Sequence, residues 1–331
     1  MVENYGLPYT GSKSRIAHWV VDHLPRARVL IDAFAGGCAI THRALLSNKW
    51  QTIIANDING RYPQLFIDAV HGKYRDEKRW ISRDDFFRLK DEDAYVACCW
   101  SFGNNLRQYL YSKDIEPYKR ALHYAIVFGD FMPMYVLMHE VAQAVHDAVG
   151  SLTNLHDRRI IAQKTIIQSL RRITGNNYAH PLIQENPFYR QIRHSNGGMG
   201  GKSLENLQRL QSLESLQSLE SFERLERLER LQSLQVDSQS YEYIDIPDDA
   251  VVYCDPPYHA SNKSFYEGTA CFDHGAFYDW CVRVSKTNPI FISEYSIEDD
   301  RFEVVAEIEK MTSMNHKRSF NVIERLYTVK R

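Results

Sequence analysis

The sequence predicts an α/β protein in which a largely parallel, doubly wound sheet is interrupted by a helical insertion. Two apolar segments near the N-terminus, 29–40 and 53–59, each read as a buried strand that ends at a turn. A third apolar strand runs into the motif at 251–258, about 220 residues after the first turn, which is more chain than the strands of one sheet need. The chain between them is rich in helical patterns, such as those at 126–149 and 160–173.

The first segment predicts a strand, a tight glycine turn and a helix at Thr41–Leu46. This arrangement is how α/β folds bring backbone amides close to a nucleoside ligand. The second segment leads to Asp57, about twenty residues after the glycines, where a carboxylate can accept hydrogen bonds from a ribose diol. The dinucleotide-binding pattern of three glycines is absent, and each feature alone is ambiguous. Together they predict a nucleoside cofactor.

Residues 5–15 are rich in turn formers, and 16–24 then reads as a short amphipathic helix. Lys13 follows Gly11 just before this helix, and such a loop can hold an anion. The spacing does not match a phosphate-binding loop. A plain helix start with a solvated lysine is the commoner meaning of the pattern, so both interpretations stay open.

The composition is that of a chain able to bury a substantial core: 44% of its 331 residues are apolar, and the net charge is −2. No segment approaches the ~18 to 20 continuous apolar residues that span a bilayer, and the N-terminus shows no signal-peptide pattern. We therefore expect a soluble, cytoplasmic protein. Six cysteines form no C-x-x-C pair and are expected to be reduced thiols in the core: Cys38, Cys98, Cys99, Cys254, Cys271 and Cys281.

The charge is unevenly spread along the chain. Between Asp157 and Lys202, eight Lys or Arg residues stand against two acids, an excess that suits a phosphate-facing surface. Two polar loops, 101–109 and 174–181, contain side chains of the types that pair with base edges, although a generic polar loop is an equal alternative for the first. The candidate DNA-binding residues are Asn104, Asn105, Arg107, Arg171, Arg172, Asn176, Asn177 and Lys202.

A low-complexity segment at 203–235 places an apolar residue at every third position from Leu204 to Leu234. A period of three matches neither the helical period of 3.6, the heptad nor the strand period of two, so no single flat face results. The composition favours helix. A tolerated insertion is the leading interpretation, and self-association through the exposed leucines is the alternative.

The strongest motif is Val251-Val252-Tyr253-Cys254-Asp255-Pro256-Pro257-Tyr258, a buried strand stopped by a carboxylate, two prolines and an aromatic ring. Asp255 can accept a hydrogen bond from an amino group, and the residue before a proline is held extended, which aims the backbone carbonyls. Tyr258 offers a flat face for stacking. The combination suits a planar exocyclic amine on a purine, although a strand end followed by a Pro-Pro turn is the bland alternative.

After this motif, the polar and aromatic loop 259–266 is suited to closing over a flipped base. A helix is expected at 272–284 with Asp273 as its cap, and a buried strand at 290–294. The last segments, 313–320 and 324–329, are expected to be edge strands.

Asp255-Pro256-Pro257-Tyr258 is the DPPY form of the catalytic motif of amino-group DNA methyltransferases, and the chain resembles the Dam-type, alpha-class branch of DNA adenine-N6 methyltransferases. The resemblance covers about 1–60 and 240–331 well and the middle poorly. It implies a Rossmann-like, S-adenosylmethionine-dependent methyltransferase sheet with an inserted, mainly helical target-recognition domain. The expected domains are a catalytic domain formed by 1–62 and 241–331, and an inserted domain at 63–240 that includes 203–235.

Further roles follow from the resemblance, residue by residue. Phe34 to Cys38 is similar to the cofactor motif F-x-G-x-G, with Cys38 in place of a glycine, which allows close backbone approach if its φ is negative. Asp57 matches the ribose-binding acid, and Asp32 would face the methionyl amine or nearby backbone. The implied S-adenosylmethionine-binding residues are Tyr9, Lys13, Asp32, Phe34, Gly36, Gly37, Asp57 and Asp255. The implied catalytic residues are Asp255, Pro256, Pro257 and Tyr258, and Glu324-Arg325-Leu326 is similar to a Glu-Leu-Leu-like strand of the family.

The resemblance thus implies a site-specific adenine methyltransferase acting on double-stranded DNA, without a metal, encoded by a bacterium or phage and associated with the nucleoid. Several alternatives stay open: methylation of cytosine at N4, methylation of adenine in RNA, and an inactive DNA-binding or scaffold protein. A protein-glutamine methyltransferase is disfavoured because its motif begins with Asn, where this chain has Asp255.

Overall fold

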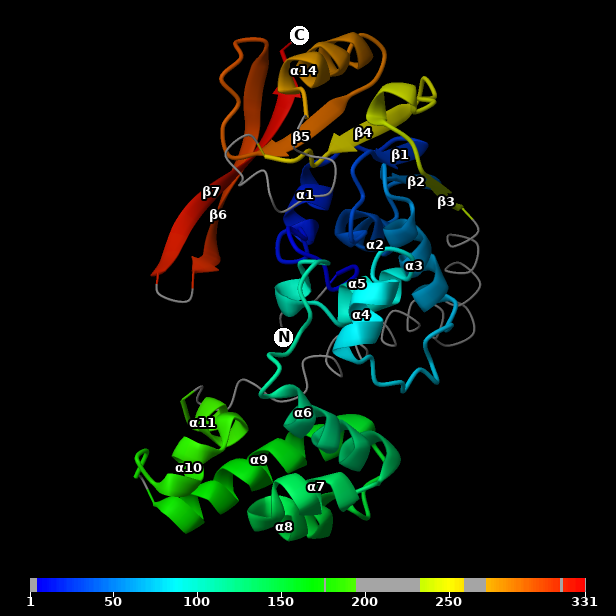
Figure 1. Cartoon of the computed structure of the whole chain (residues 1–331). Coiled ribbons are helices and arrows are strands. Elements are labelled where there is room, and N and C mark those ends of the chain that lie inside the picture. Colours follow the sequence, from blue (N-terminus) through cyan, green and yellow to red (C-terminus); the bar gives the residue numbers. More distant parts are fainter. Residues whose placement is uncertain (1–4, 176, 195–232, 259–271, 316–317, 331) are drawn as a thin grey trace. The chain divides into compact units, whose positions relative to one another are not determined.

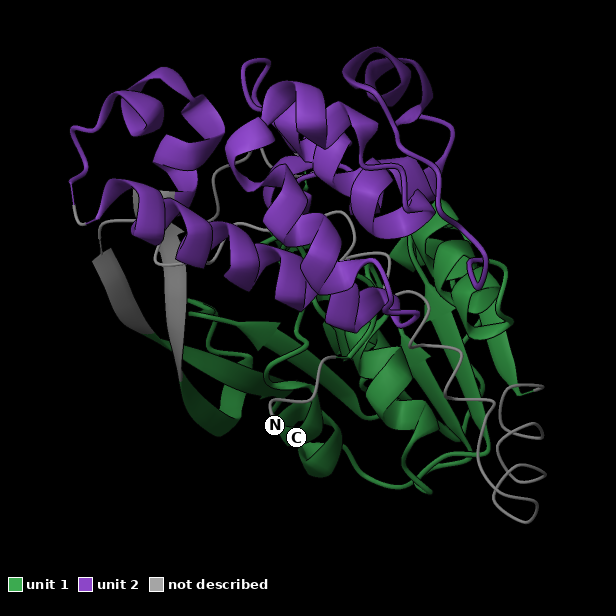
Figure 2. Ribbon diagram, turned by 90° about the horizontal axis from the view of Figure 1, so that it is seen from below, with its two compact units in different colours: residues 1–73, 210–331 green, residues 74–209 purple. Residues whose placement is uncertain are grey.

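A computed structural model gives the fold of the chain and describes residues 5–175, 177–194, 233–258, 272–315 and 318–330. The chain divides into two compact units, residues 1–73 with 210–331, and residues 74–209 (Figure 2). Most of the low-complexity segment at 203–235 and all of the loop 259–266 lie outside the described residues. In the part of the chain that is described, no helix is both long and apolar enough to cross a membrane.

The first unit is built on a seven-stranded sheet (Figure 1). The strands lie side by side in the order β3 (Leu234–Asp237), β2 (Thr52–Asn56), β1 (Val29–Asp32), β4 (Ala250–Cys254), β5 (Ile290–Glu294), β7 (Arg318–Val329) and β6 (Phe302–Asn315). The strands from β3 to β5 are parallel, and β7 runs antiparallel to both β5 and β6. The predicted Rossmann-like α/β class is confirmed.

All residues of β1 and β4 are buried, as expected for parallel strands covered on both faces. On one face Ile31, Val252 and Ile292 form a core with Phe277 and Trp280 of α14 (His274–Val284). Near the N-terminus this unit has three described helices: α1 (Ala17–His23) precedes β1, α2 (Ala39–Leu45) follows it, and α3 (Arg61–Val70) follows β2.

The C-terminal elements confirm two predictions and correct a third. β5 and α14 lie where a strand and a helix were expected, and Asp273 caps α14 by accepting a hydrogen bond from the Ala276 amide. The expectation of separate edge strands at 313–320 and 324–329 is wrong, because β6 and β7 form one long antiparallel hairpin. Cross-strand pairing stabilises the polar positions of β6, which the composition of that segment alone does not favour.

In its described residues the second unit is mainly helical, with an isolated β-bridge between Ser101 and Tyr109. The helices are α4 (Arg83–Leu89), α5 (Ala94–Cys99), α6 (Glu116–His123), α7 (Met132–Leu137), α8 (His139–Val149), α9 (Leu155–Thr174), α10 (Pro181–Glu185) and α11 (Pro187–His194), with short turns η1 (Phe102–Asn104) and η2 (Tyr124–Phe128). Its apolar core includes Val141 and Val145 of α8 and Ile166 and Leu170 of α9.

The helical pattern predicted at 126–149 is not one helix. Gly129 adopts a φ of +72° and ends η2, and Pro133 lies in the first turn of α7, so the chain breaks between the two. α9 begins five residues before the predicted start, at a cap in which Asn154 accepts a hydrogen bond from the Asp157 amide. As predicted, the cysteines in the described part of the chain are buried and are not joined in disulfides: Cys38, Cys98, Cys99, Cys254 and Cys281.

Candidate active site

Three neighbouring parallel strands place acidic residues at one edge of the sheet. β1 ends in Asp32, β2 is followed by Asp57, and β4 is followed by Asp255. Asp32 lies beside Ala55 of β2 on one side and Tyr253 of β4 on the other. The chain winds from β1 towards β2 and β3 and resumes at β4 on the opposite side, so β1 and β4 flank the switch point at which open α/β sheets bind ligands.

The glycine turn after β1 adopts left-handed backbone conformations. Gly36 has a φ of +45°, and Cys38, which begins α2, has a φ of +57°. The condition of a negative φ at Cys38 is therefore not met. A cysteine tolerates this strained geometry here because its side chain is fully buried and the surrounding turn holds the backbone, with the Cys38 amide donating to the Ala35 carbonyl.

The segment before α1 packs directly on this turn. The Leu7 amide donates to the Gly37 carbonyl over 2.7 Å, and the Gly6 amide donates to Nδ1 of His42 over 2.9 Å. A Cβ added to Gly37 would lie 2.6 Å from Cβ of Tyr9, so this position leaves no room for a side chain. The predicted residues Tyr9, Gly36 and Gly37 are thus brought together.

Asp57 is tied to the glycine turn through its carboxylate. Its Oδ2 accepts a hydrogen bond from the Gly36 amide at 2.9 Å, and its Oδ1 accepts one from the Asn59 amide at 2.8 Å. Burial raises the pKa of Asp57, while these two backbone hydrogen bonds lower it. A carboxylate offers about four acceptor positions, so Asp57 keeps acceptor capacity for the hydroxyls of a ligand.

Asp32 faces the backbone at the start of α2, which is one of the two roles expected of it. Its Oδ2 accepts hydrogen bonds from the amide of Thr41 at 3.1 Å and from Oγ1 of the same residue at 2.7 Å, which fixes the start of α2 against the end of β1. Burial raises the pKa of Asp32 to about 7, and the negative charges of Asp255 and Asp57 add to this rise. The structure supports the backbone-facing alternative of the sequence interpretation.

The pKa of Asp32 makes stability depend on pH. Its ordinary pKa is 3.8, so between that value and about 7 the folded state holds a proton that the unfolded state has lost. Stability is then lost as the pH rises through this window, by at most about 1.4 kcal/mol per pH unit. Urea unfolding of the wild type and of Asp32→Asn, measured from pH 5 to 7.5, should show that the free energy of unfolding of the wild type falls relative to that of the variant. If the two free energies changed equally with pH, the raised pKa of Asp32 would be contradicted.

Lys13 is buried and paired, so its interpretation as a solvated lysine at a plain helix start is wrong. Its Nζ lies 2.7 Å from Oδ1 of Asp255 and 3.6 Å from Oε1 of Glu324. The side chain of Lys13 is only 7% exposed, because the segment before α1 folds over the ends of β1 and β4. The carboxylate of Asp255, the candidate catalytic residue, is therefore in direct contact with the cationic side chain of Lys13.

Tyr258 lies in the same cluster. Its hydroxyl donates a hydrogen bond to Oε1 of Glu324, Lys13 lies over its ring at 4.5 Å from the centroid, and the Tyr295 ring stands edge to face with it at 4.6 Å. Burial, followed by the charges of Asp255 and Glu324, holds the pKa of Tyr258 well above its ordinary value. The hydroxyl therefore keeps its proton at physiological pH and donates a hydrogen bond.

Sequence reasoning missed some of these contacts. Tyr295 and His42 were not singled out, and Glu324 entered only through the resemblance. A signal for Glu324 did exist, since a glutamate inside the apolar strand β7 needs a buried partner. Phe34, expected at the cofactor, lies in an aromatic group with Tyr241, Phe272 and Phe277, with ring centroids 5.6–6.0 Å away.

The candidate DNA-binding residues of the second unit fall into two described groups. In the first, Asn104 donates to the Cys98 carbonyl, and Asn105 accepts from the amides of Arg107 and Gln108, so both amides shape their own loop. In the second, Arg171 and Arg172 are exposed in the last turn of α9 and Asn177 is exposed just beyond it. Asn176 and Lys202 lie outside the described residues.

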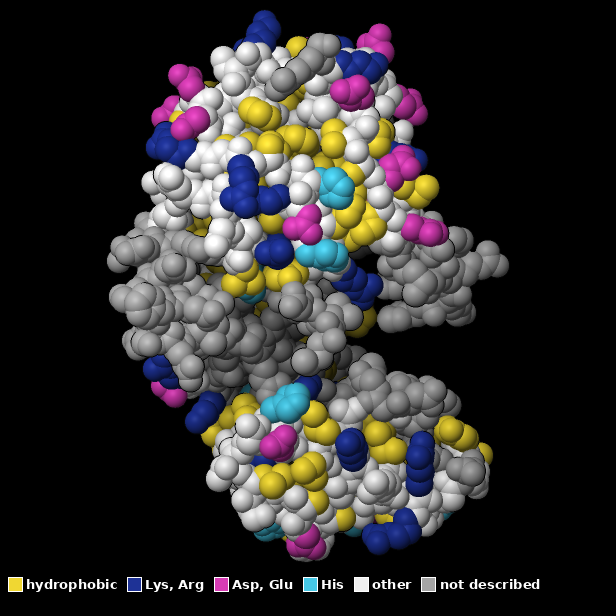
Figure 3. All heavy atoms as spheres, turned by 180° about the vertical axis from the view of Figure 1, so that it is seen from behind, with side chains coloured by type: hydrophobic (Ala, Val, Ile, Leu, Met, Phe, Trp, Pro, Cys, Tyr) yellow, Lys and Arg dark blue, Asp and Glu magenta, His cyan; other side chains and the backbone are white. Residues whose placement is uncertain are grey.

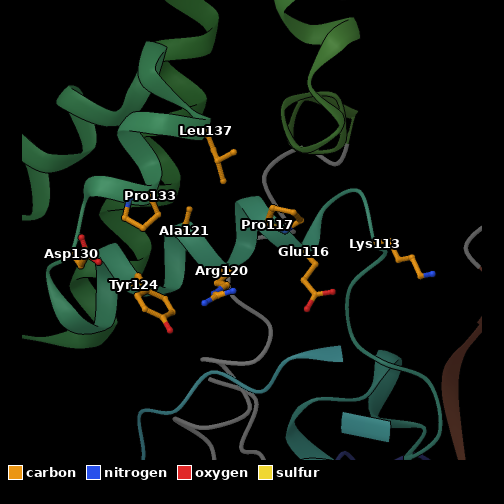
Figure 4. Close-up of a pocket in the computed structure, with 9 residues that line it drawn as sticks. All are labelled: Lys113, Glu116, Pro117, Arg120, Ala121, Tyr124, Asp130, Pro133 and Leu137. Atoms are coloured by element: carbon orange, nitrogen blue, oxygen red, sulfur yellow. The ribbon is translucent and has the colours of Figure 1, made fainter. Parts of the chain in front are cut away.

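The second unit also contains an open pocket of about 410 Å³ between α6 and α7 (Figure 4). Both signs of charge line it: Lys113 and Arg120 are basic, and Glu116 and Asp130 are acidic. Basic and acidic side chains are likewise interspersed on the molecular face drawn in Figure 3. The residues that line this pocket belong to the second unit, whereas the acidic strand ends belong to the first.

The fold is α/β, and its parallel strands carry acidic residues and the DPPY motif at one edge of the sheet, which is the arrangement of a nucleotide-binding enzyme. A family model described as "D12 class N6 adenine-specific DNA methyltransferase" matches residues 9–132. Residues 9–132 are thus similar to this class, and the match indicates methylation of adenine at N6 in DNA. The match also implies S-adenosylmethionine as the methyl donor. A comparison with curated proteins found no match.

Proposed function

We propose that this methyltransferase acts on an adenine flipped out of double-stranded DNA, with Asp255 and Tyr258 as its catalytic residues. The position of Asp255 carries the proposal: it follows β4 at the switch point of the sheet, next to β1, which leads into the glycine turn. The matched residues 9–132 do not include the DPPY motif. The roles of its residues are therefore argued from geometry and chemistry.

The residues at the strand ends fit S-adenosylmethionine. The sulfonium and ammonium groups of S-adenosylmethionine are cationic and suit an acidic edge of the sheet. Here Asp57 and Asp255 lie close enough to Asp32 for their negative charges to raise its pKa. Asp57 has acceptor capacity for the ribose hydroxyls, and Gly36 and Gly37 allow close backbone approach beside Tyr9. When bound, S-adenosylmethionine supplies an electrophilic methyl group.

The chain's own residues would prepare the adenine amine for attack. The lone pair of N6 is delocalised into the ring, so hydrogen bonds from N6 to Asp255 and to the backbone carbonyl near Pro256 favour a tetrahedral nitrogen with its lone pair directed at the methyl carbon. The bond from N6 to carbon forms as the sulfur–carbon bond breaks. The surplus proton leaves N6 through Asp255 to water. Tyr258 holds the base by stacking, which offsets part of the cost of flipping.

Lys13 orients the carboxylate of Asp255. Its Nζ lies 2.7 Å from Oδ1 of Asp255, so we assign the hydrogen bond from the adenine amine to the other oxygen, Oδ2.

We further propose that Arg171 and Arg172 contact DNA phosphates. Replacing both by alanine should weaken binding to non-specific duplex DNA and reduce the slope of log K against log salt by about two, since each phosphate contact contributes about 0.9. Fluorescence anisotropy at several NaCl concentrations measures this. The exposed pair Arg26 and Arg28 of the first unit provides a matched double-alanine control. An unchanged slope in the Arg171 and Arg172 variant would refute the contact.

The function itself is tested by transfer from labelled S-adenosylmethionine to duplex DNA, single-stranded DNA and RNA of mixed sequence, followed by separation of the product nucleosides. Label in N6-methyladenine from duplex DNA is expected. Label in N4-methylcytosine, or in RNA alone, would overturn the proposal. Self-association through 203–235 stays a prediction, which the oligomeric state of a deletion variant would test.

A further inference from the structure

Glu324 is a charged residue in the interior of β7, and its side chain is fully buried. Burying a carboxylate is costly unless it is paired and hydrogen-bonded. Its Oε1 accepts the hydrogen bond from the Tyr258 hydroxyl and lies 3.6 Å from Nζ of Lys13. Both of these partners belong to the cluster around Asp255, so the burial of Glu324 is coupled to the candidate active site.

The contacts of Tyr258 restrict the ring from several directions. The hydroxyl at its tip is anchored on Glu324, Lys13 lies over one face, and the Tyr295 ring is inclined at 87° to it. A base that stacks on Tyr258 would use the face opposite Lys13. Because β7 is paired with β5 and β6, the anchor itself is held by the sheet and not by a loop.

The geometry points to Glu324 as a positioning residue for methyl transfer, which acts through the Tyr258 hydroxyl to hold the stacking ring in place. The inference rests on the proposed role of Tyr258. Glu324 also offers Lys13 a second carboxylate besides Asp255. Without Glu324, Lys13 would be drawn to Asp255 alone and would compete more strongly with the adenine amine. The loss of Glu324 would therefore slow methyl transfer in two ways: it would release the Tyr258 ring, and it would strengthen the competition of Lys13 for Asp255.

The test uses four variants of the full chain: Glu324→Leu, Glu324→Gln, Tyr258→Phe, and the double variant Glu324→Leu with Tyr258→Phe. Glu324→Leu and Tyr258→Phe should each lower kcat about tenfold, because small errors in the placement of reacting groups are costly. The double variant should be no worse than Glu324→Leu alone, since that single change already removes the contact with the Tyr258 hydroxyl. Glu324→Gln keeps an acceptor oxygen and should recover most of kcat.

A second readout follows the base directly. Duplex DNA with 2-aminopurine at a mapped target adenine reports stacking on Tyr258 by fluorescence quenching, which should weaken in Glu324→Leu. The Kd of S-adenosylmethionine should change less than threefold, about 0.6 kcal/mol or less. Glu303, an exposed glutamate on the neighbouring strand β6, provides the control variant Glu303→Leu, which should match the wild type.

The outcomes separate this inference from the function on which it rests. A wild type that methylates no DNA overturns both. If the wild type is active and Glu324→Leu is equally active, or if the two single losses multiply in the double variant, the positioning role is overturned alone. Should Glu324→Leu fail to fold in thermal unfolding, Tyr258→Phe still tests the contact, because it removes only the hydroxyl. An unchanged kcat and unchanged quenching in that variant would reject the role.

Discussion

Replacing Asp255 by alanine is expected to lower kcat by about 1,000-fold or more. The variant loses the carboxylate that accepts a hydrogen from the adenine amine, and such positioned proton acceptors contribute about 10²–10⁴-fold. Asp255→Asn keeps a carbonyl oxygen as an uncharged acceptor and should retain more activity than the alanine variant. The measurement is single-turnover transfer of labelled methyl groups to duplex DNA, which isolates the chemical step from product release.

The control for this prediction is an acidic residue at the other end of β4. Asp249 directly precedes β4 at its opposite end and forms an exposed ion pair with Arg28, so Asp249→Ala should transfer methyl groups at the wild-type rate. Thermal unfolding checks whether the loss of the contact between Asp255 and Lys13 destabilises the fold. We expect Asp255→Ala to fold, because Lys13 still has Glu324 as a partner at 3.6 Å. A folded Asp255→Ala protein with more than a tenth of the wild-type rate would falsify the catalytic role.

Replacing Asp57 by alanine is expected to raise the Kd of S-adenosylmethionine by about 100-fold. Two hydrogen bonds from ribose hydroxyls to a carboxylate are lost, and each hydrogen bond to a charged group is worth about 1.5–3 kcal/mol. The variant also frees the Gly36 amide, which the Asp57 carboxylate holds at 2.9 Å, and so loosens the glycine turn. Isothermal titration calorimetry of the protein without DNA measures this effect apart from catalysis.

Asp68 provides the matched control for the cofactor prediction. It is an acidic residue on α3, the helix after β2, where it contacts Lys73 and Gln64, so Asp68→Ala should bind S-adenosylmethionine with the wild-type Kd. Asp57→Asn should fall between wild type and alanine, because an amide oxygen still accepts from the Gly36 amide. Wild-type affinity in Asp57→Ala would remove Asp57 from the cofactor site.

Much of the fold could be predicted from residue patterns. Apolar runs that end in Asp32, in Asp57 and at Asp255 predict parallel strands with acidic residues at their carboxyl ends, and such ends lie at one edge of a doubly wound sheet. The long interval between the first and third runs predicts an insertion, and unit 74–209 is mainly helical in its described part. These inferences depend only on local periodicity and chain length.

Other features could not be predicted, because they depend on contacts between distant segments. Nothing local distinguishes a solvated Lys13 from a buried one, and its 242-residue separation from Asp255 is bridged only when the N-terminal segment folds over the strand ends. The left-handed φ of Cys38 is imposed by the turn around it. The length of the β6–β7 hairpin is set by pairing between the two strands, which composition does not report.

The sequence by itself determined which chemical groups stand at strand ends: a carboxylate and a stacking ring at Asp255 and Tyr258, and an acid at Asp57. Those positions follow from the period of each strand and from the residues that stop it. Only the tertiary structure decided which groups face one another. Glu324 reaches Tyr258 because β7 inserts between β5 and β6, which leaves only β5 between this C-terminal strand and β4, the strand that leads into the motif.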